Sequence, residues 1–190
     1  MAKRALPVST ALFPVPVALV TSLPADGKPN IVTLAWVGIL NSEPPIIYAA
    51  IRRGRYSHPA VDSRREFVLN IASEGQLEAA EICGTLSGRD TNKWEVAKLT
   101  PVPAEKVGPP LIAECPVNLE CKVRDVLHFG SHDVFIADVV AVHANEDCVD
   151  ESGKFIVDNI KALSFFPAQY WATGKKLADR GFWLKKQKQG

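Results

Sequence analysis

VNLECKVRDVLHFGSHDVFIADVVAVHA, which spans residues 117–144, contains two runs of strand-forming residues separated by a short turn. In the first run, apolar side chains at Val117, Leu119 and Cys121 alternate with polar ones, and this period of two is typical of a half-buried strand. The turn is FGSHD, residues 129–133, and the second run follows it directly. Because a short turn reverses the chain, the segment predicts an antiparallel hairpin.

Four shorter stretches before this hairpin also have the composition of strands. They are VPVALVTS (15–22), IVTLAWVGIL (31–40), PPIIYAAI (44–51) and EFVLNIAS (66–73). After the hairpin, EDCVDESGKFIV (146–157) is a turn-rich return. Roughly seven strands joined mostly by short turns favour an antiparallel barrel or sandwich over β-α-β units. We therefore expect a mainly β fold, an antiparallel β-barrel with a few inserted short helices.

Two helices are expected between these strands. RRGRYSHPAVDSRR (52–65) contains a loop and a short helix, with Pro59 suited to the first helical turn because no N–H is needed there. EGQLEAAEICGTL (74–86) is rich in helix formers, and Gly84 is the residue expected just after the helix end.

A third short helix is expected in DTNKWEVAKL (90–99), where Asp90 or Thr91 can cap the amino end with a side-chain oxygen. PVPAEKVGPP (101–110) follows as a proline-rich connector, too short to separate domains. With 190 residues, the chain is expected to form a single domain that spans 1–190.

The composition limits the classes of function. Hydrophobic residues make up 47% and charged residues 23%, which is close to the average of globular proteins. The 22 Lys and Arg residues against 21 Asp and Glu residues give a net charge of +1, so no nucleic-acid partner is expected. No apolar run reaches the roughly 18 residues of a membrane span, so no membrane association is expected.

The beginning of the chain has a basic start and a later apolar run, as in a signal peptide. Pro7, Pro14 and Pro16 interrupt that run, and a strand is the favoured interpretation. The four cysteines form no CxxC pair and no tightly spaced Cys/His group, so no metal site is expected. Reduced thiols, with Cys121 as a core residue, favour a cytoplasmic protein.

No pattern of catalytic residues stands out. The sequence lacks an HExxH motif, a GxSxG nucleophile elbow, a Walker loop and a GxGxxG motif that enters a helix. His128 and His132 lie at the two ends of the hairpin turn, where their imidazoles could meet, although polar turn residues are the simpler interpretation. We therefore predict no catalytic acid, base or nucleophile.

IRRGRYSHPA, residues 51–60, is a candidate binding loop. The guanidinium groups of Arg52, Arg53 and Arg55 can bind phosphate oxygens in pairs, and the hydroxyl of Ser57 adds a donor. A helix that begins beside this loop would add free N–H groups to an anion site. The alternative is an ordinary solvated basic loop, which the loop by itself favours slightly.

TLAWVGILNSEPPIIYAAI, residues 33–51, has a glycine, a polar turn and two prolines inside an apolar region. A flat cofactor with a polar edge would account for these features, because Ala35 and Gly38 allow the backbone to approach a ring closely. Trp36 could pack near such a ring, and the two prolines, 44–45, would turn the chain away from it. The alternative is an ordinary core strand with a bulge at Gly38.

Five segments in the same order and spacing resemble the flavin reductase-like family of FMN-binding split β-barrel proteins, in particular its flavoredoxin-like branch. The resemblance covers nearly the whole chain. It rests on PVALVTS…DGKPNIVTLAW (16–36), NSEPPIIYAAI (41–51), EFVLNIAS (66–73), SGRDTNKWE (87–95) and GSHDVFIADVVAVH (130–143). The resemblance implies a split antiparallel β-barrel and a homodimer with one FMN per subunit, bound in a groove near the dimer interface.

The resemblance also implies which residues bind the cofactor. The strand from Thr33 to Gly38 would line the flavin, largely through its backbone. The loop that carries Arg52, Arg55 and Ser57 would hold the phosphate and the ribityl chain. The full set of expected cofactor-binding residues is Thr33, Leu34, Ala35, Trp36, Gly38, Arg52, Arg55, Ser57, Asn70, Arg89, Lys93 and His132.

Within that set, Asn70 matches an asparagine that recurs after the fourth strand of the family, and Arg89 and Lys93 match an SGxDxxK segment. His132 matches a recurrent histidine whose role stays open. One departure is AWV, residues 35–37, which stands where many relatives carry hydroxyl residues. Side-chain hydroxyl bonds to the flavin are therefore not expected there, and the bulky tryptophan would narrow the space over the ring.

Three functions follow as alternatives. The favoured one is an NAD(P)H-dependent flavin reductase, in which a hydride passes from NADH or NADPH to FMN and electrons then pass to an acceptor. That acceptor is left open and includes free flavin, a partner monooxygenase or another protein. The second function is a flavoredoxin-type electron carrier with a protein partner. The third is a barrel that only binds FMN or another phosphate-bearing ligand.

Overall fold

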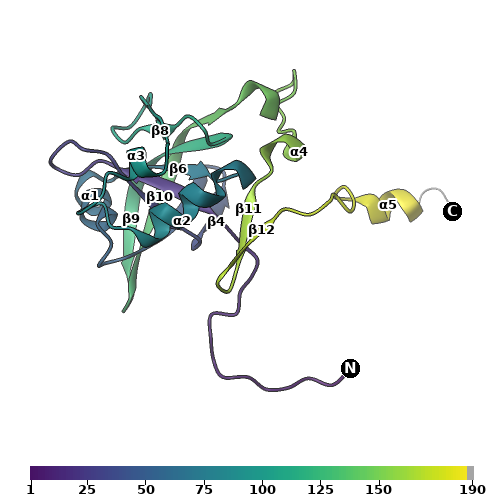
Figure 1. The fold of residues 1–190 in the computed structure, drawn as a ribbon. Helices are drawn as coiled ribbons and strands as arrows, with labels where there is room; N and C mark the ends of the chain where they lie inside the picture. Colours follow the sequence, from purple (N-terminus) through teal and green to yellow (C-terminus); the bar gives the residue numbers. More distant parts are fainter. Residues whose placement is uncertain (188–190) are drawn as a thin grey trace.

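A seven-stranded antiparallel sheet, in the order β3-β2-β6-β9-β10-β5-β4, forms the body of the protein (Figure 1). The computed structural model describes residues 1–187. The strands of this sheet are β2 (Ala18–Ser22), β3 (Asn30–Leu34), β4 (Val37–Ser42), β5 (Pro45–Arg52), β6 (Glu66–Ile71), β9 (Val117–His128) and β10 (His132–Ala144). The edge strands β3 and β4 follow each other in the chain with only Ala35 and Trp36 between them, so the sheet is rolled and its edges lie close together. The expected split antiparallel β-barrel is confirmed.

The hairpin of β9 and β10 forms as predicted, but the expected alternation of buried and exposed residues fails at the start of β9, where Asn118 and Glu120 of the polar phase are buried as well. Its partners run from Val117 opposite Ala144 to His128 opposite Asp133. Two register shifts along the pair mark bulges. Bulges increase the local twist of a strand, and this helps a sheet to curl into a barrel.

The single strand expected over residues 31–40 is divided into two. Ala35 and Trp36 leave the β3 ladder, and the carbonyl of Trp36 accepts a hydrogen bond from the N–H of Ala50 at 2.9 Å. After β4 the chain turns as expected, and β5 begins at Pro45. Both β3 and β4 contain apolar residues, so composition alone gave no sign of the break between them.

Packing against a neighbouring strand explains why residue 38 is a glycine. It lies opposite Tyr48 in the β4–β5 pair, and a Cβ atom at this position would be 2.6 Å from Cε1 of that ring. The register shift of this pair lies between Ile39 and Asn41 and not at Gly38. The glycine therefore makes room for the aromatic ring of the neighbouring strand.

Short helices connect the strands, and two small sheets lie beside the barrel. The helices are α1 (Ser57–Arg64), η1 (Glu74–Gln76), α2 (Leu77–Thr85), α3 (Lys93–Val96), η2 (Glu146–Cys148), α4 (Val157–Ile160) and α5 (Phe182–Gln187). One small sheet contains β1 (Val15–Pro16), β11 (Leu163–Phe166) and β12 (Gln169–Ala172), and the other contains β7 (Pro101–Val102) and β8 (Leu111–Ile112). Both ends of the described chain extend away from the barrel (Figure 1). Among residues 1–187, no helix has the length and apolar character needed to cross a membrane.

The first two expected helices form, with one correction. Pro59 lies in the first turn of α1, as predicted. Gly84 was expected just after the end of α2, but the helix continues through it to Thr85. A Cβ at Gly84 would lie 3.4 Å from the Cβ of Thr33, so the glycine allows α2 to pack closely on β3.

The third expected helix, α3, is shorter than predicted and has a different cap. The side-chain oxygen of Asn92 accepts a hydrogen bond from the N–H of Trp94 at 3.2 Å. The predicted capping residues, Asp90 and Thr91, lie before Asn92, so that prediction was wrong. All three residues are good capping types, so the sequence could not decide among them.

Two apolar clusters meet at β2, because successive side chains of a strand point to opposite faces. Val20 belongs to the cluster inside the barrel, together with Phe135 and, as predicted, Cys121. Leu19 belongs to a second cluster with Ile31 and with residues of α2 and α3. The second cluster holds both helices over the outer face of β3, where the cavities of the protein lie.

Candidate functional site

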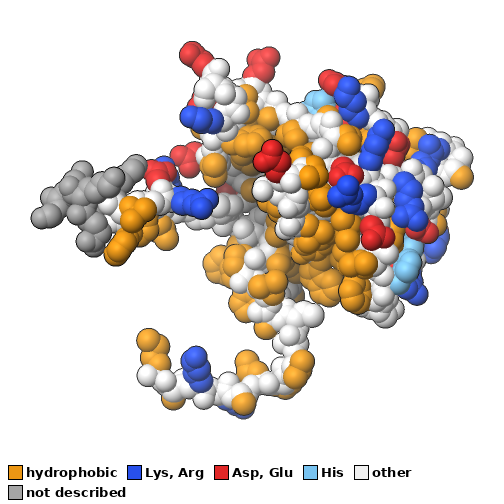
Figure 2. All heavy atoms as spheres, turned by 180° about the vertical axis from the view of Figure 1, so that it is seen from behind, with side chains coloured by type: hydrophobic (Ala, Val, Ile, Leu, Met, Phe, Trp, Pro, Cys, Tyr) orange, Lys and Arg blue, Asp and Glu red, His pale blue; other side chains and the backbone are white. Residues whose placement is uncertain are grey.

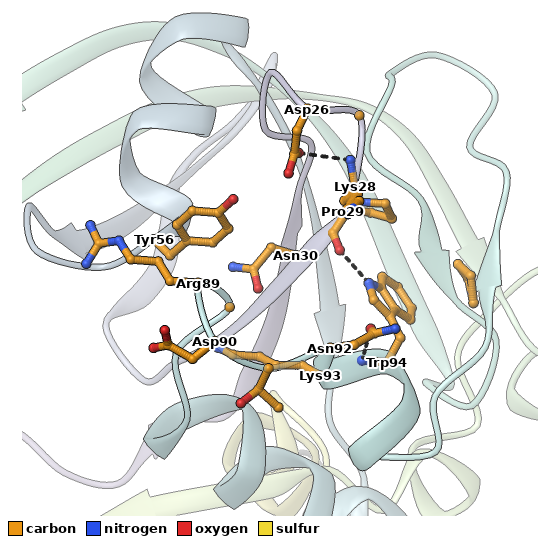
Figure 3. A pocket seen from close by; sticks show the side chains of 14 residues that line it. Asp26, Lys28, Pro29, Asn30, Tyr56, Arg89, Asp90, Asn92, Lys93 and Trp94 are labelled. Carbon is orange, nitrogen blue, oxygen red and sulfur yellow. Dashed lines mark hydrogen bonds between the residues drawn. The ribbon is translucent and has the colours of Figure 1, made fainter.

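Three adjoining cavities lie around β3. The basic cavity has a volume of about 200 Å³ and is lined by residues 54–57 and 85–89 together with Asn30, Val32 and Lys93. The apolar cavity, of about 350 Å³, is lined by Val17, Thr33, Ala35, Glu81, Gly84, Thr85, Phe165, Ala168 and Tyr170. Thr85 lines both and marks the place where they adjoin. The outer cavity, of about 660 Å³, shares Asn30, Tyr56, Gly88, Arg89 and Lys93 with the basic cavity (Figure 3).

Lys93 is a buried cation at the floor of the basic cavity. Its exposed fraction is 4%, and Nζ donates hydrogen bonds to the carbonyls of Ile31 at 2.7 Å and Cys83 at 2.9 Å. An ammonium has three protons, so one remains for a further acceptor. Burial lowers the pKa of Lys93, the Cys83 thiol opposes this shift, and the charge of Arg55 adds to it. An anion in the cavity would therefore favour the charged form.

The basic cavity contains cations and no carboxylate. Arg55, Arg89 and Lys93 line it, and its lining includes neither Asp nor Glu. None of these three cations takes part in the ion pairs found among residues 1–187. Cavities with an excess of one charge attract ligands of the opposite charge. The arrangement therefore fits an anion such as phosphate.

A buried hydrogen bond fixes the wall between the basic and outer cavities. Asn30 Nδ2 donates to Ser57 Oγ at 2.7 Å. Ser57 is the acceptor in this bond, so its own hydroxyl proton can be donated to an anion. Gly88 packs against this wall so closely that a Cβ atom there would overlap Asn30 Oδ1 and lie 2.9 Å from Tyr56 Cδ1. The guanidinium of Arg89 lies 5.8 Å from the centre of the Tyr56 ring.

Aromatic and small apolar side chains make up most of the lining of the apolar cavity. One wall is formed by Phe165 and Tyr170, whose rings meet edge to face with centroids 5.2 Å apart. Burial, together with the hydrogen bond from its hydroxyl to Glu81 Oε2 at 3.0 Å, raises the pKa of Tyr170 to about 12, so this hydroxyl stays protonated. Thr33 also lines the cavity, and its Oγ1 donates to the carbonyl of Ala80 at 2.6 Å. The Thr33 side chain is thus occupied, and contacts from this strand would come from its backbone.

Trp36, His132 and Arg52 form a separate group at one end of the sheet. The rings of Trp36 and His132 have centroids 4.4 Å apart, and Arg52 lies opposite His132 in the β5–β10 pair. None of these three residues lines the cavities described above. Trp36 has an exposed fraction of 42% and is available to a partner or ligand.

The other expected site residues have side chains directed elsewhere. Leu34 belongs to the cluster inside the barrel, so only its backbone can face a ligand. Asn70 is fully buried: Nδ2 donates to the carbonyl of Leu19 at 2.7 Å, and Oδ1 accepts from Ile112 N–H and from Asn118 Nδ2. With these bonds its side chain holds β2, β6 and β9 together, and its part in cofactor binding stays a prediction.

Of the twelve expected residues, the structure therefore brings six together along the basic and apolar cavities: Thr33, Ala35, Arg55, Ser57, Arg89 and Lys93. Sequence reasoning missed several others that line the same space. Asn30, Tyr56 and Thr85 had no distinguishing signal in the sequence. Gly88 did have one, since it stands in the SGRD segment, where only a residue without a side chain can pack against Asn30.

Comparison with known proteins identifies the family. The model of the flavin reductase like domain matches residues 10–173. The chain belongs to the flavin reductase-like family. Among solved structures, the flavoredoxin of Desulfovibrio vulgaris (Miyazaki F) is similar, with a TM-score of 0.86 and 31% identity over 94% of this chain and 97% of that one.

Two sequence relatives extend the comparison. An uncharacterised protein of Archaeoglobus fulgidus is 36% identical over 131 residues, which is 69% of this chain and 73% of that protein. The FMN reductase (NADH) of Rhizobium rhizogenes is 25% identical over 157 residues, which is 82% of each chain. Membership of the family thus rests on similarity along most of the barrel.

Proposed function

We propose that this protein is an FMN-dependent oxidoreductase, with the FMN phosphate in the basic cavity and the isoalloxazine ring in the apolar cavity. The observation that supports this most directly is the buried ammonium of Lys93 in a cavity without a carboxylate. A phosphate dianion would offset the cost of burying that charge. The adjoining apolar cavity, of about 350 Å³, offers space for a flat ring.

Each residue of the site has a definite part in this proposal. Arg55 and Arg89 would bind phosphate oxygens through their guanidinium groups, and Lys93 would act as a point charge. Ser57 would donate its hydroxyl proton, and the backbone next to Ala35 would border the ring. The flavin supplies the redox chemistry, because it can accept a hydride and pass electrons onward. The protein's own residues bind and orient it, and the hydride step needs no side-chain acid or base.

We propose NADH or NADPH as the source of the hydride. The similarity to the FMN reductase (NADH) of Rhizobium rhizogenes supports this choice. A second candidate function is an electron carrier that receives electrons from a protein partner. The likeness to a flavoredoxin over nearly the whole chain favours it, as does the exposed Trp36, whose indole would limit the approach of a nicotinamide.

We further propose that the protein is a homodimer. Strand β4 is a free edge of the sheet, and Ile39 and Leu40 on it are exposed, with Trp36 just before it. Hydrophobic side chains gather on the face seen in Figure 2, near the point where the N-terminal segment leaves the barrel. Exposed apolar edges are typically covered by a partner. Light scattering of the purified protein should give twice the mass of one chain, and a monomer would contradict the proposal.

The proposed function can be tested by absorbance spectroscopy of the purified protein without oxygen. The spectrum is recorded after incubation with FMN and removal of free ligand, and again after addition of NADH or NADPH. Flavin bands that bleach within seconds would support the reductase. Bands that persist would support the electron carrier. A protein that stays colourless after incubation with FMN would overturn both.

A further inference from the structure

Asp133 binds three basic side chains at once. Its side chain is 5% exposed, and Oδ1 accepts hydrogen bonds from Nε and Nη2 of Arg53 at 3.0 and 2.9 Å. Oδ2 lies 2.8 Å from Nε2 of His58, and Oδ1 lies 3.1 Å from Nδ1 of His128. The hydrogen bond from Arg53 holds the pKa of Asp133 well below its ordinary value, and both histidines act in the same direction against the effect of burial.

The three partners come from different elements. Arg53 lies in the loop after β5, His58 is the second residue of α1, and His128 is the last residue of β9. Asp133 itself is the second residue of β10. One carboxylate therefore ties the loop and the start of α1 to the tip of the β9–β10 hairpin.

The sheet does not depend on this connection. β10 is paired with β5 and β9 through backbone ladders on both sides, and the two bulges of the β9–β10 ladder lie beyond Asp133. What the carboxylate adds is a fixed position for the loop, because Arg53 and His58 stand immediately before and after residues 54–57. Those four residues line the basic cavity.

Arg55 depends on the loop for its placement. Among residues 1–187, the backbone N–H of Arg55 donates to the carbonyl of Arg52 at 3.0 Å, and His58 N–H donates to the carbonyl of Arg55 at 3.0 Å. These bonds shape a local turn but do not orient that turn relative to the barrel. At the far end of the loop, the bond from Asn30 to Ser57 holds one point. The near end begins at Arg52, which is paired with His132 in the β5–β10 ladder, and Asp133 adds contacts with Arg53 and His58 on the two sides of residues 54–57.

We propose that Asp133 is a positioning residue for the phosphate end of the cofactor site. By holding Arg53 and His58, it sets the loop on which Arg55 and Ser57 meet the phosphate. The inference rests on the proposed function for the identity of the ligand. It assigns to Asp133 no contact with the flavin.

The substitution Asp133→Asn keeps the shape of the side chain and removes its charge. We expect the affinity for FMN to fall about tenfold, the lower end of the loss seen when a partner that orients a metal ligand is removed. Riboflavin has the same ring and ribityl chain without the phosphate, so its affinity should stay unchanged. A merely structural role would weaken the binding of both ligands alike.

The experiment compares the wild type with Asp133→Asn and with the control Asp138→Asn. Asp138 lies on the same strand and pairs with Arg124 instead of the loop. Each protein, freed of flavin, is titrated with FMN and with riboflavin, and its free energy of unfolding is measured. Arg53→Gln, a change at a half-exposed side chain, provides a milder test if Asp133→Asn does not fold.

A loss of FMN affinity alone, in Asp133→Asn or in Arg53→Gln, supports the proposal. Equal losses for FMN and riboflavin, no loss in either variant, or the same loss in Asp138→Asn would overturn it. Failure of the wild type to bind FMN is a different result and would overturn the proposed function instead. When both variants fold, their effects on FMN affinity should be less than additive, because they break the same contact.

Discussion

The indole of Trp36 and the imidazole of His132 lie against each other, with their planes inclined by 36°. They belong to the short crossing between β3 and β4 and to the first residue of β10, which are far apart in the sequence. Ser131 Oγ lies 2.8 Å from Nδ1 of the imidazole. The contact joins the segment that borders the proposed ring site to the tip of the long hairpin.

The ionisation of His132 gives a first prediction. Burial, with the charge of Arg52 added, lowers the pKa of His132 from 6.5. The folded protein therefore binds this proton less readily than the unfolded chain, so stability is full above about pH 6.5 and falls as the pH decreases through that value. We expect the free energy of unfolding to decrease less between pH 7.5 and pH 5.5 in His132→Asn than in the wild type. The same pH dependence in both proteins would show that the imidazole is not shifted.

A second prediction concerns access to the flavin. If Trp36 narrows the approach of a nicotinamide, Trp36→Ala should be reduced by NADH or NADPH faster than the wild type while FMN affinity stays similar. The measurement is the anaerobic bleaching rate in a stopped-flow instrument. Trp183→Ala is the control, since Trp183 is an exposed tryptophan in α5. An unchanged rate in Trp36→Ala would mean that the indole does not limit access.

The buried ammonium gives a third prediction. Lys93→Met retains much of the side-chain volume and removes the charge. A hydrogen bond to a charged group contributes about 1.5–3 kcal/mol, so FMN affinity should fall by at least about tenfold. Riboflavin should bind as before, and Lys122→Met, at an exposed position on β9, should change neither affinity. Equal losses for the two ligands in Lys93→Met would place the phosphate elsewhere.

A fourth prediction tests the close packing at Gly88. In Gly88→Ala the new methyl group would displace Asn30 and Tyr56, and overpacking of this kind costs about 1–3 kcal/mol of stability. FMN binding should weaken as well, because the bond between Asn30 and Ser57 would be disturbed. Gly130→Ala is the matched control, since no atom lies within 4 Å of a Cβ built there. Urea unfolding and FMN titration of both variants provide the readout, and a fully stable Gly88→Ala would contradict the packing argument.

Much of the barrel could be predicted from the sequence, for an identifiable reason. The β9–β10 hairpin could be predicted because apolar and polar residue types alternate in β9 and a short turn joins the two strands. Buried and partly exposed residues alternate in the first half of β10, whereas both faces are buried at the start of β9. The break at Ala35 and Trp36 has no such signal. It exists because the sheet is rolled and the chain must cross from one edge to the other, which is a property of the whole sheet.

Of the residues that line the candidate site, those with charged or hydroxyl side chains were the ones that the sequence could point to. Arg55 and Ser57 stand in a segment whose composition and resemblance predict a phosphate site, and Lys93 stands in one whose resemblance predicts only a position near the cofactor. Asn30 does not, because its importance comes from a bond to Ser57 and a close contact with Gly88 that only the folded chain creates. Asn70 shows the reverse case, since a residue expected at the cofactor has its side chain engaged between strands.

The burial of Lys93 has a consequence for the life of the protein in a cell. Two carbonyl groups only partly replace the water that an ammonium loses on burial. The native protein without a bound anion is therefore less stable than the same protein with one. A ligand that binds only the native state raises stability in proportion to the logarithm of its concentration. Chains made while flavin is scarce would unfold more often and be degraded sooner, whereas loaded chains would persist. If FMN is the anion that Lys93 binds, as proposed, the abundance of this protein should follow the supply of FMN, even without any change in its synthesis.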